Sequence, residues 1–310
     1  MPLFDAYVFV DWSARNRLSP AKASSDAIWV GELTPPDGHV ERYCRGRAEA
    51  TEHVRRQLSS HVEEGRRVLV GFDFPYAYPG GLARCLGLEG APAWRAVWDR
   101  LGELVTDDEK NASNRFAAAH ALNELIGGGP GPFWGCPPAA ATASLSGTKT
   151  GVFAFPYATS AGSLERLRAT ERAIGGVQES WKLSGAGSVG SQALVGIPRV
   201  RELRDDPDVA HVSTVWPFET GFTSAPAPER GPYVLHAEIW PGIVPKGEVD
   251  DEILATGAIR DQAQVRLMCV WAHREDAVGA LGPRFDPGSL AAPETREAAA
   301  AEEGWILGVG

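Results

Sequence analysis

The chain has 310 residues, of which 44% are hydrophobic and 23% charged, so it holds enough apolar residues for a sizeable core. Its net charge of −10 argues against a protein that binds nucleic acid through a broad basic face, because such binding depends on neutralising phosphates. The four cysteines are scattered without a C-x-x-C pair, which predicts neither a zinc site nor a disulfide framework and favours a reducing cytoplasm. No apolar segment has the length of a signal peptide or a membrane span, so we expect no membrane association.

The first predicted element is the apolar run from Tyr7 to Val10, which ends in a carboxylate at Asp11. A continuous apolar run predicts a central strand that is covered on both faces, with Asp11 where the strand leaves the sheet. The stretch 68–75 repeats this pattern and carries Asp73 after its own apolar run. Two strands that each end in one carboxylate predict a divalent-metal site with oxygen ligands. The alternative is that each aspartate caps the turn or helix that follows it.

Between these two strands the sequence predicts two more strands and a helix. Residues 26–33 and 39–44 have the composition of strands, and the Pro-Pro-Asp-Gly turn at 35–38 joins them. Residues 48–64 have helical spacing, and Gly65 ends that helix. The expected order is therefore β-β-β-α-β, with the first three strands forming an antiparallel meander.

The middle of the chain is predicted to be helical and then irregular. Residues 79–126 have helical patterns, and a stretch rich in Gly, Pro and Ala follows from 127 to 162. A connection of this length is usually a functional loop or a lid. Trp134 is one of its aromatic residues, which either pack on the domain or stack on a ligand.

The second half supplies two more candidate acids. The sequence predicts helices at 163–174, at 191–203 with an interruption at Pro198, and at 259–274, and strands at 211–216, 233–240 and, as an edge strand, 304–308. Glu238 falls near the carboxyl end of the strand 233–240, and Asp261 near the start of the last helix. Glu238 is thus a third strand-end acid of the same kind as Asp11 and Asp73.

A glycine-rich segment at 185–190 fits the spacing G-x-G-x-x-G. A dinucleotide-binding fold needs a buried strand directly before this motif, and residues 179–184 are too polar to form one. A phosphate bound by the backbone amides around Ser188, with Lys182 beside it, agrees better with the sequence.

The order of elements and acids resembles the ribonuclease-H-like superfamily, and in particular its branch of predicted nucleases of unknown function. The matching motifs are Val10–Trp12, Phe72–Pro75, Glu238–Pro241 and Arg260–Gln262. The resemblance implies an α/β fold with a mixed sheet in the order β-β-β-α-β-α-β-α, in one domain over residues 1–310, with 79–205 as a large insertion. It also implies that the four acids bind Mg²⁺ or Mn²⁺ and catalyse phosphodiester hydrolysis.

Three functions remain open from the sequence. The first is a metal-dependent nuclease acting on short or single-stranded nucleic acid. The second is a phosphotransferase or hydrolase for a small phosphorylated metabolite, and the third is a binding protein without catalysis. Basic residues lining the groove near Asp11 would favour the first, and a closed pocket under residues 128–160 would favour the second. The oligomeric state does not follow from the sequence.

Overall fold

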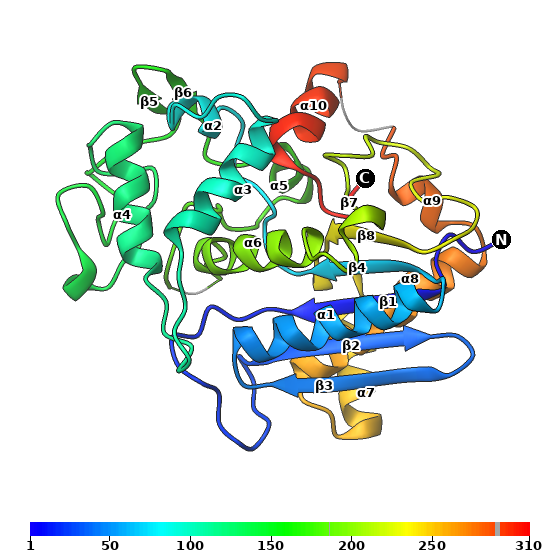
Figure 1. Ribbon diagram of the computed structural model, residues 1–310. Helices are drawn as coiled ribbons and strands as arrows, with labels where there is room; N and C mark the ends of the chain where they lie inside the picture. The colour runs from blue at the N-terminus through cyan, green and yellow to red at the C-terminus, as the bar shows by residue number, and fades with distance from the viewer. Residues whose placement is uncertain (186, 289–291) are drawn as a thin grey trace.

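The computed structural model describes residues 1–185, 187–288 and 292–310, and a mixed six-stranded sheet lies at its centre (Figure 1). The strand order is β3-β2-β1-β4-β8-β7, in which β2 runs antiparallel to both neighbours and the other pairs are parallel. The strands are β1 (Ala6–Asp11), β2 (Ile28–Thr34), β3 (Gly38–Cys44), β4 (Arg67–Phe72), β7 (Ser213–Val215) and β8 (Tyr233–Glu238). A separate hairpin pairs β5 (Tyr157–Thr159) with β6 (Gly162–Leu164).

Helices cover both faces of the sheet. Within the described residues they are α1 (Arg47–Glu63), α2 (Leu82–Cys85), α3 (Ala93–Leu104), α4 (Arg115–Ile126), α5 (Ala169–Ile174), α6 (Gly190–Arg204), α7 (Lys246–Thr256), α8 (Arg260–Ala277), α9 (Leu281–Arg284) and α10 (Pro293–Ala298). Short helical turns occur at 138–140, 210–212, 241–243 and 299–303. None of the helices in the described part of the chain is long and apolar enough to cross a membrane.

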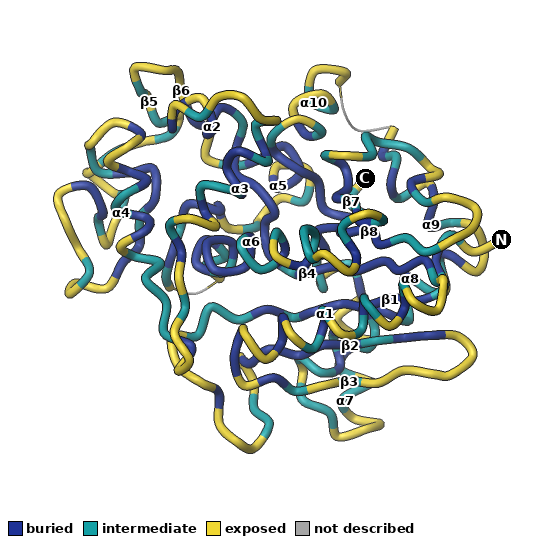
Figure 2. The backbone as a smooth tube through the Cα atoms, in the orientation of Figure 1, coloured by how far each residue is buried: buried dark blue, intermediate teal, exposed yellow. Residues whose placement is uncertain are grey.

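The central strands have apolar side chains on both sides, as the sequence of β1 predicts. Val8 and Val10 pack into the core shared with α1 and α6, whereas Tyr7 and Phe9 pack into the core shared with α8. This division follows from the alternation of side chains along a strand. Figure 2 shows the resulting contrast, with β1 and β4 buried along their length and β3 largely exposed at the edge of the sheet.

Helix α8 packs closely on β2 because Gly31 lacks a side chain. A Cβ atom at Gly31 would lie 3.0 Å from the carbonyl oxygen of Val265 on α8. The glycine thus lets α8 lie close to the middle of β2.

The predicted order β-β-β-α-β and the antiparallel meander are confirmed by β1, β2, β3, α1 and β4. Two of the predicted helices differ in the structure. The expected helix at 163–174 is instead the end of β6 followed by α5, because Glu171 accepts a hydrogen bond from the backbone N–H of Arg168 and caps the helix there. The helix α6 also continues through Pro198 without interruption.

The segment 304–308, expected as an edge strand, forms only a single parallel bridge. Ile306 pairs with Glu238, and the N–H of Leu307 donates to the Glu238 carbonyl at 2.9 Å. Strand β7 pairs with β8 only as far as His236, so the last residues of β8 are open to the C-terminal segment.

The segment 79–205, expected as an insertion, carries α2 to α6 and the β5–β6 hairpin. Its helix α6 belongs to the main core rather than to a peripheral layer. Gly196 of α6 lies against the ring of Phe74, so close that a Cβ atom would overlap it. Helix α6 therefore fixes the chain directly after Asp73.

Candidate functional site

Asp11 and Asp73 lie next to each other at the carboxyl ends of the two central strands. The parallel register pairs Val10 with Phe72, so Asp11 and Asp73 are the following residues of the two strands. The N–H of Asp73 donates to the Val10 carbonyl at 3.2 Å, and the N–H of Trp12 donates to Asp73 Oδ1 at 2.6 Å. The pair predicted from the sequence is therefore brought together by parallel pairing.

Asp261 joins this pair from α8, the helix that packs on the face of the sheet formed by Tyr7 and Phe9. It lies in the first turn of α8, where the partial positive charge of the helix end favours a carboxylate. Its Oδ2 accepts a hydrogen bond from the N–H of Asp26 at 2.8 Å. Asp26 is a fourth acid that the sequence reasoning did not select.

The position of Asp26 follows from strand pairing. Asp26 comes two residues before β2, and the antiparallel register places Trp29 of β2 opposite Asp11. The beginning of β2 therefore lies beside the end of β1. Asp26 is the first residue of the predicted strand 26–33, and an acid at the start of the second strand of a meander was the signal that could have identified it.

Burial and mutual repulsion change the acidity of this cluster. Burial raises the pKa of Asp11 well above its usual range, and the charges of Asp73, Asp261 and Asp26 raise it further. Burial also raises the pKa of Asp73, against the opposing hydrogen bond from the Trp12 N–H. The pKa of Asp261 is raised by burial as well, with the Asp26 N–H opposing the shift. Each carboxylate thus lacks a full compensating charge.

No ion pair to these four carboxylates is present among the described residues. In the same part of the chain, no group of three or more His, Cys, Asp or Glu side chains is arranged to hold a metal ion. The charges of Asp73, Asp261 and Asp26 act on Asp11, but the four side chains do not form a complete metal coordination shell by themselves.

Glu238 was expected to be a fourth metal ligand, but in the structure its side chain forms an ion pair with Arg168. The register pairs Glu238 with Phe72, so its side chain points to the face opposite to that of Asp73. There it accepts two hydrogen bonds from Arg168, at 2.7 and 2.6 Å, and one from the N–H of Tyr76 at 3.0 Å. Arg168 is 0% exposed and Glu238 is 2% exposed. Glu238 is thus neutralised in a buried ion pair and does not join the aspartates.

Two pockets meet at this edge of the sheet. The larger one, about 640 Å³, contains Asp11, Asp26 and Asp261 together with Arg15 and Arg17. The smaller one, about 340 Å³, is mainly apolar; its lining includes Asp73, Phe74, Val177, Glu238 and Trp240. The loop before α6 separates them, since Ser188 lines the larger pocket and its neighbours Gly187 and Val189 line the smaller one.

Of the three predicted phosphate- or substrate-binding residues, Lys182 and Trp134 lie side by side, but Ser188 does not share a pocket with them. Ser188 lies in the larger pocket, whereas Lys182 and Trp134 line neither of the two pockets. The Lys182 ammonium lies 5.8 Å from the Trp134 ring, and the indole N–H of Trp134 donates to Glu179 at 2.8 Å. Ala186, within the glycine-rich segment, lies outside the described residues.

The segment before the glycine-rich motif is not a strand, in agreement with the argument against a dinucleotide-binding fold. Gly190 begins α6, and its N–H donates to the Lys182 carbonyl at 3.0 Å.

Comparison of the chain with models of known protein families, with curated proteins and with solved structures gives no match.

Proposed function

We propose that the protein is a metal-dependent nuclease that hydrolyses phosphodiester bonds in short or single-stranded nucleic acid. The observation that carries this proposal is the composition of the larger pocket, in which Arg15 and Arg17 line the same space as Asp11 and Asp261. A carboxylate cluster can hold a hard cation, and guanidinium groups bind phosphate oxygens. Both requirements of phosphodiester hydrolysis therefore occur in one pocket.

The arrangement of the sheet supports the proposal. The chain begins with β1-β2-β3-α1-β4, the elements with which the ribonuclease-H-like resemblance also begins, and β7, β8, α7 and α8 follow after a long insertion. In this arrangement the central parallel strands carry Asp11 and Asp73, and α8 carries Asp261. Parallel sheets commonly place ligands at the carboxyl ends of their strands.

The donor chemistry fits Mg²⁺ or Mn²⁺. Oxygen ligands favour these hard ions over zinc. Burial raises the pKa of Asp11 and of Asp73, and no ion pair among the described residues offsets that burial. Mg²⁺ usually binds to one or two carboxylates and completes its shell with water and substrate phosphate. An incomplete protein shell is therefore compatible with this ion, and Asp11, Asp73 and Asp261 are the residues that would hold it.

The bound ion would lower the pKa of a water molecule and stabilise charge on the leaving oxygen. The protein's own contribution is to fix the carboxylates. The Trp12 N–H orients Asp73, and the side-chain amide of Gln192 on α6 donates to the Trp12 carbonyl at 2.6 Å. The residue that orients Asp73 is thereby itself held by α6.

Thermal melting with metal tests the site. At a metal concentration 100 times Kd, binding stabilises the fold by about 2.7 kcal/mol, or roughly 4 °C for a chain of this length. We expect Asp11→Asn to remove most of this shift and Asp37→Asn, in the exposed turn between β2 and β3, to leave it unchanged. No shift with either Mn²⁺ or Mg²⁺ in the unmutated protein would contradict the proposal.

Cleavage of a fluorescently labelled single-stranded oligonucleotide tests the reaction itself. Asp73→Asn should lower kcat by roughly 100-fold or more, because several kcal/mol of transition-state stabilisation come from a bound ion. Cleavage that persists in EDTA would show that the reaction uses another mechanism.

The smaller pocket favours a second function, the hydrolysis of a small phosphorylated metabolite. Its volume of about 340 Å³ and its apolar lining next to Asp73 suit one compact organic group. The pocket expected for this function under residues 128–160 is not the one seen, since those residues line neither pocket at the sheet edge. Hydrolysis of a nucleoside monophosphate ester with no cleavage of oligonucleotides would favour this second function.

A further inference from the structure

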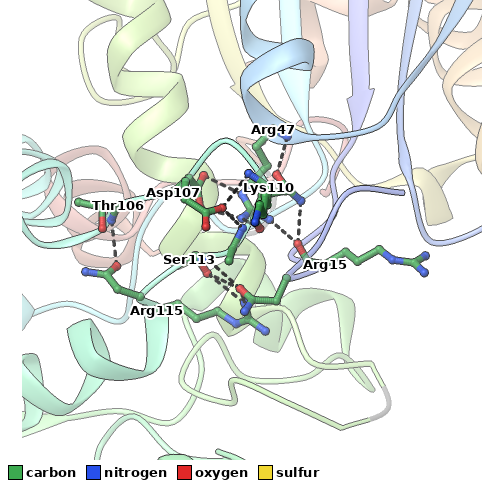
Figure 3. Close-up of polar contacts among 12 residues, drawn as sticks. Arg15, Arg47, Thr106, Asp107, Lys110, Ser113 and Arg115 are labelled. Carbon is green, nitrogen blue, oxygen red and sulfur yellow. Dashed lines mark hydrogen bonds and ion pairs between the residues drawn. The ribbon is translucent and has the colours of Figure 1, made fainter. Parts of the chain in front are cut away.

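The segment that leaves β1, residues 13–17, is fixed by a buried arginine from α1. Arg47 is 0% exposed, and its Nη1 donates to the carbonyls of Arg15 at 2.8 Å and Ser13 at 3.4 Å. The opposite side of the guanidinium is bound by Asp107, with Nη2 at 2.6 Å from Oδ1 and Nε at 2.8 Å from Oδ2. Arg47 therefore ties the backbone of this segment to the loop between α3 and α4 (Figure 3).

Two asparagines fix the rest of the segment. The side-chain amide of Asn111 donates to the carbonyl of Arg15 at 2.8 Å and to that of Arg17 at 3.4 Å. Asn16 Oδ1 in turn accepts hydrogen bonds from the N–H of Ser113 at 2.8 Å and from its hydroxyl at 3.1 Å. These contacts use the backbone of the segment and the side chain of Asn16, and none of them uses the guanidinium of Arg15 or Arg17.

The two guanidinium groups are therefore available to a ligand. Arg15 is half-buried, Arg17 is exposed, and both line the larger pocket with Asp11 and Asp261. Figure 3 shows the Arg15 side chain extending away from the cluster that fixes its backbone. No ion pair of Arg15 or Arg17 is seen among the residues that the structure describes. Within the described residues, these two cations thus have no ion-pair partner, in a pocket that contains three carboxylates.

We propose that Arg15 and Arg17 bind two phosphates of a short single-stranded oligonucleotide, next to the phosphodiester at the aspartates. One guanidinium group can donate two parallel hydrogen bonds to the oxygens of a phosphate. Because the backbone of this segment is already fixed, it loses little conformational entropy when a ligand binds. Because the carboxylates repel an anion, this binding requires a divalent cation at the aspartates. The inference rests on the proposed function and adds the groups that select the substrate.

The test is a salt titration of binding to a nuclease-resistant, phosphorothioate-linked single-stranded tetranucleotide in the presence of Mn²⁺. Two phosphate contacts to a single strand give a slope of log K against log salt of about −1.4, since each contributes about −0.7. Arg15→Gln and Arg17→Gln should each reduce the slope to about −0.7 and weaken binding roughly tenfold at low salt, because each removes charge-assisted hydrogen bonds. Arg56→Gln, on the exposed side of α1, is the matched control and should change neither quantity.

The melting shift with Mn²⁺, measured on the same variants, separates this inference from the proposed function. Parental affinity and slope in both arginine variants, with the Mn²⁺ shift intact, would overturn the inference alone. A missing Mn²⁺ shift in the unmutated protein would overturn the proposed function. A nucleoside monophosphate that binds as tightly as the tetranucleotide would overturn the assignment to an oligonucleotide, because the second and third phosphates would then contribute nothing.

Discussion

Replacing Glu238 with glutamine separates a structural role from the metal-binding role that the sequence predicts. The substitution keeps the size of the side chain but removes the negative charge that faces Arg168. Arg168 is 0% exposed and would keep only Glu171, at 2.9 Å, as a carboxylate partner. Because the guanidinium of Arg168 is buried, it cannot reach water after losing its main counter-ion, and the folded state is destabilised.

The size of the effect follows from burial. Breaking a buried ion pair by removing one partner costs about 3 to 5 kcal/mol, and the remaining partner Glu171 places this case at the lower end. We therefore expect Glu238→Gln to lower the free energy of unfolding by roughly 3 kcal/mol and Tm by about 5 °C. Glu103→Gln provides a matched control, because Glu103 is 65% exposed in a surface pair with Arg100. Its effect should stay below about 0.5 kcal/mol.

Urea unfolding measures the loss of stability, and melting with and without Mn²⁺ measures the metal response of the same variant. We expect Glu238→Gln to be less stable but to retain the full Mn²⁺ shift. The double variant Arg168→Gln/Glu238→Gln should be more stable than the sum of the two single losses predicts, since the two residues interact directly. A Glu238→Gln protein of parental stability that has lost its metal response would refute this reasoning and restore Glu238 to the ligand set.

Two further predictions concern the core around the site. Burial lowers the pKa of His236 to about 3, below its usual value of about 6.5, so the unfolded chain takes up a proton that the folded one does not. Between about pH 6.5 and the folded-state pKa of about 3, protonation of His236 in the unfolded chain should lower the free energy of unfolding by about 1.4 kcal/mol for each pH unit. Urea unfolding at pH 4.5 and 7 should therefore show a smaller difference in His236→Gln than in the unmutated protein. Gly196→Ala should cost about 1 to 3 kcal/mol because the new Cβ overlaps the Phe74 ring. Gly247→Ala in α7, where a Cβ meets nothing within 4 Å, should not destabilise the protein, and equal effects of the two glycine substitutions in urea unfolding would contradict the packing argument.

The first half of the sheet could be predicted from the sequence because its signals are local. The apolar run before Asp11 is long enough to require burial on both faces, and the Pro-Pro-Asp-Gly turn requires that the next two strands form a hairpin. The repeated pattern at Asp73 then predicted a second strand of the same kind. Parallel pairing of such strands brings their final acids together, so this part of the site was predicted as well.

The remaining members of the site depend on relations between distant segments. The pattern of β8 places Glu238 near the carboxyl end of a strand, but only the register against β4 decides to which face it points. A shift of one residue in that register would have exchanged Glu238 with Ile239, and the acid would then have faced the aspartates. No local pattern in the sequence encodes that choice.

The same limit applies to the residues that the sequence reasoning did not find. Arg15 and Arg17 occur in a polar loop without a recognisable motif, and they line the site only because Arg47 and Asn111 hold their backbone beside Asp11. The sequence determined which strands carry acids, since burial and turn formation are properties of short segments. The tertiary structure decided which charged groups share a pocket, because strand register and buried ion pairs join residues far apart in the chain.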